Sequence, residues 1–374
     1  MKFEQIMPSA TTMADATLPT VAMDTEAGTQ YNVLHGYTSE LDSTLFYGNI
    51  TPVAKDRKLT VTINTYGEDI EGVAYKIRSL EDKSLIENTE VSDYDNAGSS
   101  INVTFNIKNL LDTGKEYALE IVLKTKKHEA VYYYTRIVYG VDYDLQKKLD
   151  FVMDFNACTF DDSRLKDISG YLETSSSGDN TNYGKVNINC SLSQVGWGDL
   201  DPYVESDIMP EVISVDDDVA ILRLSYRVGA ANDYSSSDTY TVSEYYRIRQ
   251  TNSGFYLLNF EREMNQVFDA RNDLTSTAKI NLGINSSTDV NCASDEKGIY
   301  TYFVNQGSLW CFNSSSQTFT RVFSFKGEET DSVREGYDAH NIKIMKIEDN
   351  GDATFLVSGY MNRGEPVSYT HLTL

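Results

Sequence analysis

The stretch Lys58-Leu-Thr-Val-Thr-Ile-Asn64 decides the fold class, because its apolar and polar residues alternate one by one. Leu59, Val61 and Ile63 fall on one side of this pattern, and a period of two is typical of a half-buried β-strand. Similar short runs follow at residues 73–80, 101–107, 117–123 and 131–138. Turn sequences separate these runs without an intervening helical period. The pattern predicts an antiparallel β-sandwich over residues 19–141.

One local motif refines this prediction. The sequence Leu111-Asp-Thr-Gly114-Lys-Glu-Tyr117 resembles the L-x-P-G-x-x-Y corner of fibronectin type III domains, with Thr113 in place of the proline. In that corner the tyrosine hydroxyl hydrogen-bonds to backbone upstream of it. We therefore expect an immunoglobulin-like or fibronectin III-like sandwich, with Tyr117 closing the corner.

Composition limits the classes of function. The 374 residues include 56 acidic and 32 basic side chains, which gives a formal net charge of −24. Nucleic-acid binding is disfavoured, because phosphates are neutralised by Lys and Arg. The 26 Tyr and only 6 Pro favour β-structure. The length predicts two or three domains, each with enough chain for a core.

The periodicity changes after residue 141. Leu145, Leu149, Val152 and Met153 follow helical spacing, and Leu165, Ile168 and Leu172 indicate a second short helix. We expect residues 142–183 to be a helical connector that ends in a polar loop.

The pattern of residues 184–366 again predicts mainly strands. The pattern predicts strands at residues 219–226, 245–249, 255–259, 299–305, 308–313, 319–325, 342–347 and 354–359. Phe260, Met264, Val267 and Phe268 carry a helical stripe, which predicts one interrupting helix. Short strands with tight turns are typical of β-propeller blades, so an incomplete propeller is one prediction for this domain. A generic sandwich or another α+β fold is the alternative.

Three groups of residues suggest chemistry, and each has a structural explanation. Asp216-Asp217-Asp218 and Asp199-Leu-Asp201 could supply paired carboxylates for glycoside hydrolysis, but turn formation is the simpler interpretation. Asp349-Asn-Gly-Asp352 predicts a hairpin turn. The four cysteines have no metal-binding spacing; we expect buried free thiols, with one or two disulfides as the alternative.

No nucleophile, phosphate-binding or cofactor motif is recognisable. We therefore assign no catalytic, cofactor-binding or metal residues. The aromatic side chains of Tyr132, Tyr134, Trp197 and Trp310 are the candidates for stacking on a sugar or a peptide. Core packing is the alternative role for most of them. Strand alternation predicts that Tyr132-Tyr-Tyr134 points to both faces of its sheet.

Several segments resemble an uncharacterised family of exported proteins from clostridial-type bacteria. They include IMPSATTM, LHGYTSELD, ITPVAKDRKL and YYYTRI, and SLWCFN, HNIKIMKI and SGYMNRG further on. The resemblance implies a transmembrane anchor just before IMPSATTM, with residues 1–18 as a linker, and extracytoplasmic β-domains. It implies no activity. The terminal residues 367–374, VSYTHLTL, resemble a translated sequencing adapter, so we expect the biological sequence to stop near Pro366.

These observations favour a non-catalytic binding or sensing module at the bacterial cell envelope. Its partner would be an unknown protein or glycan, and it would be tethered to the membrane outside the cytoplasm. The alternative function is an envelope enzyme that acts on glycans and whose site is completed by a missing C-terminal part. The alternative location is the cytoplasm, if Met1 is the true start.

Overall fold

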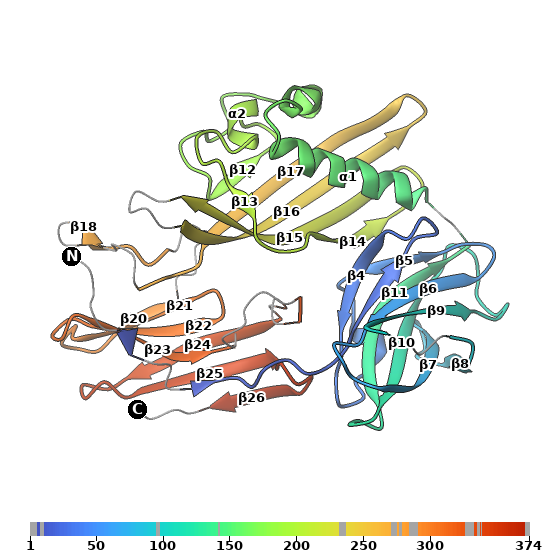
Figure 1. The fold of residues 1–374 in the computed structure, drawn as a ribbon, viewed down its shortest axis with the longest axis horizontal. Helices are drawn as coiled ribbons and strands as arrows, with labels where there is room; N and C mark the ends of the chain where they lie inside the picture. Colours follow the sequence, from blue (N-terminus) through green and yellow to red (C-terminus); the bar gives the residue numbers. More distant parts are fainter. Residues whose placement is uncertain are drawn as a thin grey trace.

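The computed structural model shows a mainly β protein built from three sheet assemblies (Figure 1). It describes residues 6–7, 11–94, 98–140, 143–231, 237–270, 275–276, 279–283, 291–325, 333–334, 337 and 339–370. An N-terminal sandwich and a long-stranded sheet share one continuous hydrophobic core. The C-terminal strands have separate, smaller cores.

The predicted N-terminal sandwich is present. One sheet has the order β4-β3-β6-β9 and the other the order β5-β11-β10-β7-β8. Their bounds are β3 Thr20–Asp24, β4 Gln30–His35, β5 Ile50–Val53, β6 Lys58–Asn64, β7 Ile70–Ser79, β8 Leu85–Val91, β9 Ser100–Asn106, β10 Glu116–Thr125 and β11 Val131–Tyr139. Leu59, Val61 and Ile63 of β6 are all buried, as their alternation predicts.

The corner before β10 also forms as predicted. The Tyr117 hydroxyl accepts a hydrogen bond from the Asp112 amide at 2.8 Å. Gly114 has φ +76°, a left-handed conformation that costs glycine little. The missing proline therefore does not prevent the turn, because the glycine and the tyrosine supply its geometry and its hydrogen bond.

The helical stretch does more than connect two domains. It contains α1 (Leu145–Thr159) and the 3₁₀ helix η2 (Leu165–Tyr171). Leu149, Val152 and Phe155 of α1 are buried in the continuous core. Figure 1 shows α1 lying across the long-stranded sheet. This helix is a layer of the second domain, so the boundary expected at residue 184 does not separate two cores.

The long sheet has the order β12-β17-β16-β15-β13, and β14 also pairs with β15. Its bounds are β12 Lys185–Asn187, β13 Tyr203–Val204, β14 Met209–Val215, β15 Val219–Ala231, β16 Ser237–Thr251 and β17 Gly254–Gln266, with the short α2 helix (Leu192–Val195) after β12. The helix predicted from Phe260 and Met264 is wrong, because both residues lie in β17. Residues four apart share a face in a strand as well as in a helix, so this spacing could not distinguish the two.

The C-terminal strands form a sandwich-like pair of sheets rather than recognisable blades. One sheet contains β20 (Cys292–Ser294), β21 (Tyr300–Asn305), β22 (Ser308–Asn313) and β23 (Thr318–Ser324); the other contains β24 (His340–Ile347), β25 (Ala353–Tyr360) and β26 (Pro366–Thr370). A shared core joins side chains of both. An incomplete propeller is not confirmed, since the described strands surround no central axis. Residues 349–352 form the predicted hairpin turn between β24 and β25.

Both chain ends contribute backbone to this region. β1 (Ile6–Met7) and β2 (Thr11–Thr12) pair in parallel with β23, so part of the expected linker 1–18 extends a sheet. Of the adapter-like residues, 367–370 belong to β26, and residues 371–374 lie outside the described part of the chain. Two short strands of two residues each, β18 (Thr275–Ser276) and β19 (Lys279–Ile280), pair antiparallel before β20.

The contacts that join the assemblies include two side-chain junctions. Asn32 is fully buried in a left-handed conformation, and its Oδ1 accepts from the Val212 amide at 2.7 Å. Its Nδ2 donates to the carbonyl of Ile50 at 2.9 Å and to the Thr51 hydroxyl at 3.1 Å. One side chain thereby links β4, β5 and β14.

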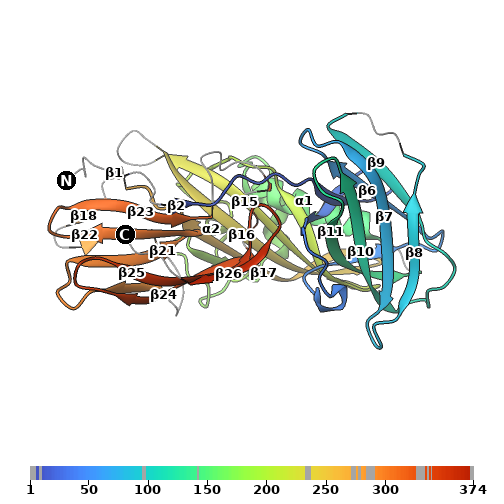
Figure 2. The ribbon, with the colours of Figure 1, turned by 90° about the horizontal axis from the view of Figure 1, so that it is seen from below.

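The second junction joins the N-terminal sandwich to the C-terminal strands. His35 stacks on Tyr337 with 4.1 Å between ring centroids and meets Tyr360 edge-on at 6.0 Å. The Tyr360 hydroxyl donates to the Gly36 carbonyl at 3.0 Å. In Figure 1 the C-terminal sheets lie below the long sheet and beside the N-terminal sandwich, and Figure 2 shows the sandwich and the C-terminal sheets toward opposite ends of the molecule.

Candidate functional site

The long sheet has one covered face and one open face. Alternate residues of β15, β16 and β17 point toward α1 and are buried: Leu222, Leu224, Tyr226, Val242, Glu244, Tyr246, Phe260, Arg262 and Met264. The residues between them point the other way and are mostly exposed.

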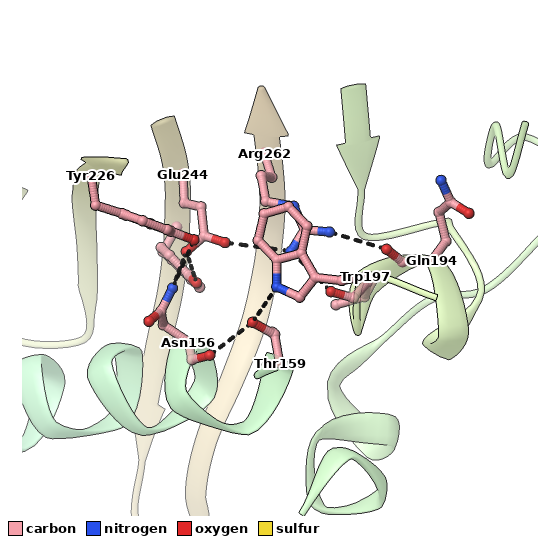
Figure 3. A network of polar contacts seen from close by, with 9 residues as sticks. Asn156, Thr159, Gln194, Trp197, Tyr226, Glu244 and Arg262 are labelled. Atoms are coloured by element: carbon pink, nitrogen blue, oxygen red, sulfur yellow. Dashed lines mark hydrogen bonds and ion pairs between the residues drawn. The ribbon is translucent and has the colours of Figure 1, made fainter. Parts of the chain in front are cut away.

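The covered face contains a buried ion pair. Arg262 and Glu244 are both completely buried, with Nη1 and Oε1 3.7 Å apart. The Arg262 guanidinium also donates to the carbonyls of Val195 at 2.9 Å and Gln194 at 3.0 Å. It lies 3.4 Å from the centre of the Trp197 ring (Figure 3). Burial lowers the pKa of Arg262. The carbonyls and the ring stabilise a charge that burial alone would penalise.

The carboxylate of this pair is held from α1 and from its own sheet. Glu244 Oε2 accepts from the Asn156 amide at 2.8 Å and from the Tyr246 hydroxyl at 2.6 Å. Asn156 also donates to the Tyr226 hydroxyl at 3.1 Å. Burial raises the pKa of both tyrosines well above the usual value. The network therefore fastens α1 to the sheet, and its fully buried charges present no surface to a substrate.

A second buried cation fixes the beginning of α1. Lys148 is fully buried, and its Nζ donates to the carbonyls of Asp216 at 2.8 Å and Asp217 at 3.1 Å. Burial lowers the pKa of this ammonium group. Neutral carbonyl oxygens replace the water that the ammonium loses, so the contact anchors the helix to the β14–β15 turn.

The acidic triplet at that turn is explained by backbone contacts. Asp216 Oδ1 accepts from the amides of Asp218 at 3.0 Å and Val219 at 2.6 Å. The three exposed aspartates line an open depression of about 530 Å³ together with Val219 and Arg249. Turn formation, the simpler of the two predicted roles, accounts for the Asp216 carboxylate.

The open face carries arginine and tyrosine on adjacent strands. In the strand register, Arg223 of β15 lies opposite Tyr245 of β16, and Arg249 of β16 lies opposite Tyr256 of β17. On β16, Arg247 lies between Tyr245 and Arg249, two residues from each of them. Tyr256 is 54% exposed. We call these five residues the arginine–tyrosine face.

The arginines of the open face differ in their ion pairs. Arg223 lies 3.3 Å from Glu211, and the adjacent Arg227 lies 3.7 Å from Glu205. Arg247 and Arg249 are exposed, and neither makes an ion pair within the described residues. Two arginines without an ion pair among the described residues therefore stand on one side of a strongly acidic protein.

The predicted tyrosine candidates lie on β11, away from the long sheet. Alternation is confirmed: Tyr133 is fully buried on one face, and Tyr132 and Tyr134 share the other. Tyr132 is partly exposed, with the Lys76 ammonium 5.9 Å from its ring. Tyr134 is only 5% exposed, and its hydroxyl accepts from the Leu41 amide at 2.7 Å. Of this pair, only Tyr132 has surface to offer a ligand.

The two tryptophan candidates are core residues. Trp197 is 1% exposed, and its Nε1 donates to the Thr159 hydroxyl at 3.3 Å. Trp310 is 8% exposed and packs edge-on against Phe268 at 5.0 Å. The four aromatic candidates therefore do not form one site. The core-packing alternative accounts for Tyr134, Trp197 and Trp310, because aromatic area is most stabilising when buried.

Sequence reasoning missed the arginine–tyrosine face. Arg247-Ile-Arg249 alternates within a strand, so both guanidinium groups had to share the face opposite the buried Ile248. That signal was available in the sequence. The contribution of Arg223 and Tyr256 was not, because it depends on the pairing of β16 with two other strands.

Within the described residues, no three His, Cys, Asp or Glu side chains come together as a metal site. The cysteines are free; Cys158, Cys190 and Cys311 are buried, as expected, and Cys292 is exposed. Burial raises the pKa of Cys311 to about 11. No helix in the described ranges is long and apolar enough to span a membrane.

Comparison with known proteins gives little. No protein-family model matches the sequence, and no curated protein matches it. The crystal structure of Spo0M, a sporulation control protein from Bacillus subtilis, aligns with a TM-score of 0.20 and 7% identity. The alignment covers 68% of this chain and 91% of that one. A likeness at this level carries no argument about fold or function.

Proposed function

We propose that the protein is a non-catalytic binding module that acts outside the cytoplasmic membrane, with the open face of the long sheet as its contact surface. The observation that carries this proposal is the contrast between the two faces. The covered face contains the core and a buried network of hydrogen bonds around the Arg262–Glu244 ion pair. The open face exposes Arg247 and Arg249 without ion pairs within the described residues.

A rigid platform of this kind suits binding. The network behind the sheet restrains the strands, so exposed side chains are held in position before a partner arrives. Preorganisation reduces the entropy lost on association. Two of the carboxylates around the face have structural roles, since Glu211 pairs with Arg223 and Asp216 completes its turn. This arrangement supports recognition rather than acid–base chemistry.

Location outside the membrane is supported by the resemblance to anchored, exported proteins and fits the net charge of −24. The partner would be a glycan or protein of the cell envelope. Protease added to intact cells that express the full-length gene should cleave the protein. Complete protection, with cleavage after lysis, would show that the protein is cytoplasmic.

Co-sedimentation tests the function. Purified protein is mixed with cell-envelope fragments of a clostridial-type bacterium, and the pelleted fraction and the released reducing sugar ends are measured. We expect saturable pelleting without release of sugar ends. Failure to pellet contradicts the binding function, whereas sustained release of sugar ends supports the glycan-acting enzyme instead.

A further inference from the structure

We propose that the arginine–tyrosine face binds an extended polysaccharide that carries carboxylate groups. The inference rests on the proposed binding function and adds the chemical class of the ligand. Arg247 and Arg249 would hold carboxylates, and Arg223 would add a third contact beside its ion pair with Glu211. Tyr245 and Tyr256 would contact sugar rings. Nothing in the sheet covers these residues: Arg223, Arg247, Arg249 and Tyr256 are exposed, and Tyr245 is partly exposed.

The spacing of the guanidinium groups suits a repeating anion. Arg223 pairs with Tyr245, so Arg247 is its diagonal neighbour across the strands. Diagonal neighbours lie about 7–8 Å apart, and Arg249 follows Arg247 at roughly 7 Å along β16. A guanidinium group can bind a carboxylate through two parallel hydrogen bonds. Three such groups in a row match a polymer with several carboxylates better than a single small anion.

The aromatic residues favour sugar as the backbone of that polymer. Tyr256 lies directly opposite Arg249, and Tyr245 directly opposite Arg223. Tyrosine combines an apolar ring with a polar hydroxyl, which suits the mixed surface of a sugar. Exposed Ser225 and Ser243 form the adjacent cross-strand pair and add hydroxyl groups. Two of the three proposed ion contacts, Arg223 and Arg249, thus have a tyrosine directly opposite.

The shape of the face favours a long ligand. β15 and β16 contain 13 and 15 residues, and strands of this length extend roughly 40–50 Å. The face is a sheet surface, and its strands satisfy one another's backbone groups. An acidic peptide that binds by strand addition needs unpaired backbone, which a sheet edge rather than a sheet face provides. We therefore assign the face to a polysaccharide and not to a peptide.

Acidic neighbours limit where the ligand can lie. Glu261 and Glu263 of β17 continue the same face beyond Tyr245 and Ser243, and Asp216–Asp218 border Arg249. Like charges repel a polyanion, so the ligand should follow β15 and β16 across the arginines. Broad attraction of polyanions is not expected at a net charge of −24.

Titration with defined polymers tests the inference. The full-length protein is titrated with polygalacturonate, neutral dextran, polyglutamate and phosphatidylglycerol vesicles at low and moderate salt. We expect binding to polygalacturonate that weakens with salt, and little binding to the other three. Arg247→Ser with Arg249→Ser should weaken it by about 100-fold, or roughly tenfold for each arginine.

Three further variants give the test its specificity. Lys124→Ser with Lys126→Ser removes the same charge from exposed positions on the N-terminal sandwich and should leave affinity within about twofold. Arg247→Lys with Arg249→Lys keeps the charge but loses the paired hydrogen bonds, so it should recover only part of the affinity. Tyr256→Ala should weaken binding to polygalacturonate.

Several results would overturn the inference. Equal binding of polyglutamate with no effect of Tyr256→Ala would assign the face to acidic peptides, and preference for vesicles would assign it to membranes. Equal loss in the lysine control would show a nonspecific charge effect. If wild-type protein pellets with envelope fragments but the double arginine variant pellets equally well, the ligand assignment fails while the binding function stands. If neither pellets, the binding function itself fails.

Discussion

The two faces of the long sheet use arginine in opposite ways. On the covered face, Arg262 is enclosed by a carboxylate, two carbonyls and a tryptophan ring. On the open face, Arg247 and Arg249 stand in solvent without ion pairs within the described residues. Arg262 on β17 therefore stabilises the structure. Arg247 and Arg249, on the adjacent strand β16, are candidates for recognition.

The difference follows from solvation. A buried guanidinium group loses its water and must be compensated completely, so it fixes its neighbours in one arrangement. An exposed one keeps its hydration and can exchange it for a ligand. Substitutions on the covered face should therefore change stability, whereas substitutions on the open face should change binding.

The largest effect is expected from Arg262→Met. The change leaves the Glu244 carboxylate buried without its cation, which should lower the free energy of unfolding by about 3–5 kcal/mol. Adding Glu244→Gln should recover much of this loss, because the remaining side chain is neutral. Urea denaturation measures both. A loss below about 1 kcal/mol for the single variant would contradict the role of the network.

Asn32→Ala should have the next largest effect. It removes one acceptor and two donor contacts that join β4, β5 and β14, and it places alanine at φ +49°. The expected loss is about 2–3 kcal/mol. Asn88→Ala, at an exposed position of β8, is the control and should cost under about 0.5 kcal/mol. Equal losses of stability in the two variants would show that the Asn32 side chain does not link these strands.

Acid should weaken the junction around His35. Burial among aromatic rings lowers the pKa of His35 from 6.5 to about 3, so the folded state holds this ring neutral. Its contribution is complete above pH 6.5 and is lost as the pH falls toward 3, because the unfolded chain takes up the proton first. Stability should fall by up to about 2 kcal/mol between pH 7 and pH 5.

His35→Gln provides the comparison for this prediction. Its unfolding free energy should depend less on pH over the same interval, whereas His128→Gln should follow wild type. Unfolding is measured at each pH by urea denaturation. Identical pH profiles for wild type and His35→Gln would mean that His35 does not sense acid at this junction.

The smallest effect on stability is expected on the open face. Arg247→Ser with Arg249→Ser should change the unfolding free energy by no more than about 0.5 kcal/mol, as is usual for exposed sites. Thermal denaturation checks this value. A loss comparable to that of Arg262→Met would abolish the distinction between the two faces.

Sequence predicted the parts of the fold that depend on local pattern. The alternation at Leu59, Val61 and Ile63 predicted β6, and the spacing from Gly114 to Tyr117 predicted a corner that the structure contains. The stripe at Phe260 and Met264 failed because four-residue spacing fits both helix and strand. The face that α1 covers also could not be predicted, since it depends on contacts between distant segments.

The candidate site was harder to predict from the sequence, because the conspicuous aromatic residues were chosen as the candidates. Trp197 is conspicuous in the sequence, yet it packs on Arg262 inside the protein. The alternation of Arg247 and Arg249 places both on one face and can be read from the sequence. The pair gains significance from its neighbours on other strands and from the absence of ion partners among the described residues. Pairing and burial are properties of the fold, so they required the structure.

An environment-sensitive fluorophore tests most directly whether the open face is the contact surface. It is attached at Ser243→Cys on the open face, or at Lys166→Cys beside α1, each with Cys292→Ser to remove the exposed native thiol. The account predicts that cell-envelope fragments change the emission at position 243 and leave position 166 unchanged. A change at position 166 with none at position 243 would contradict it.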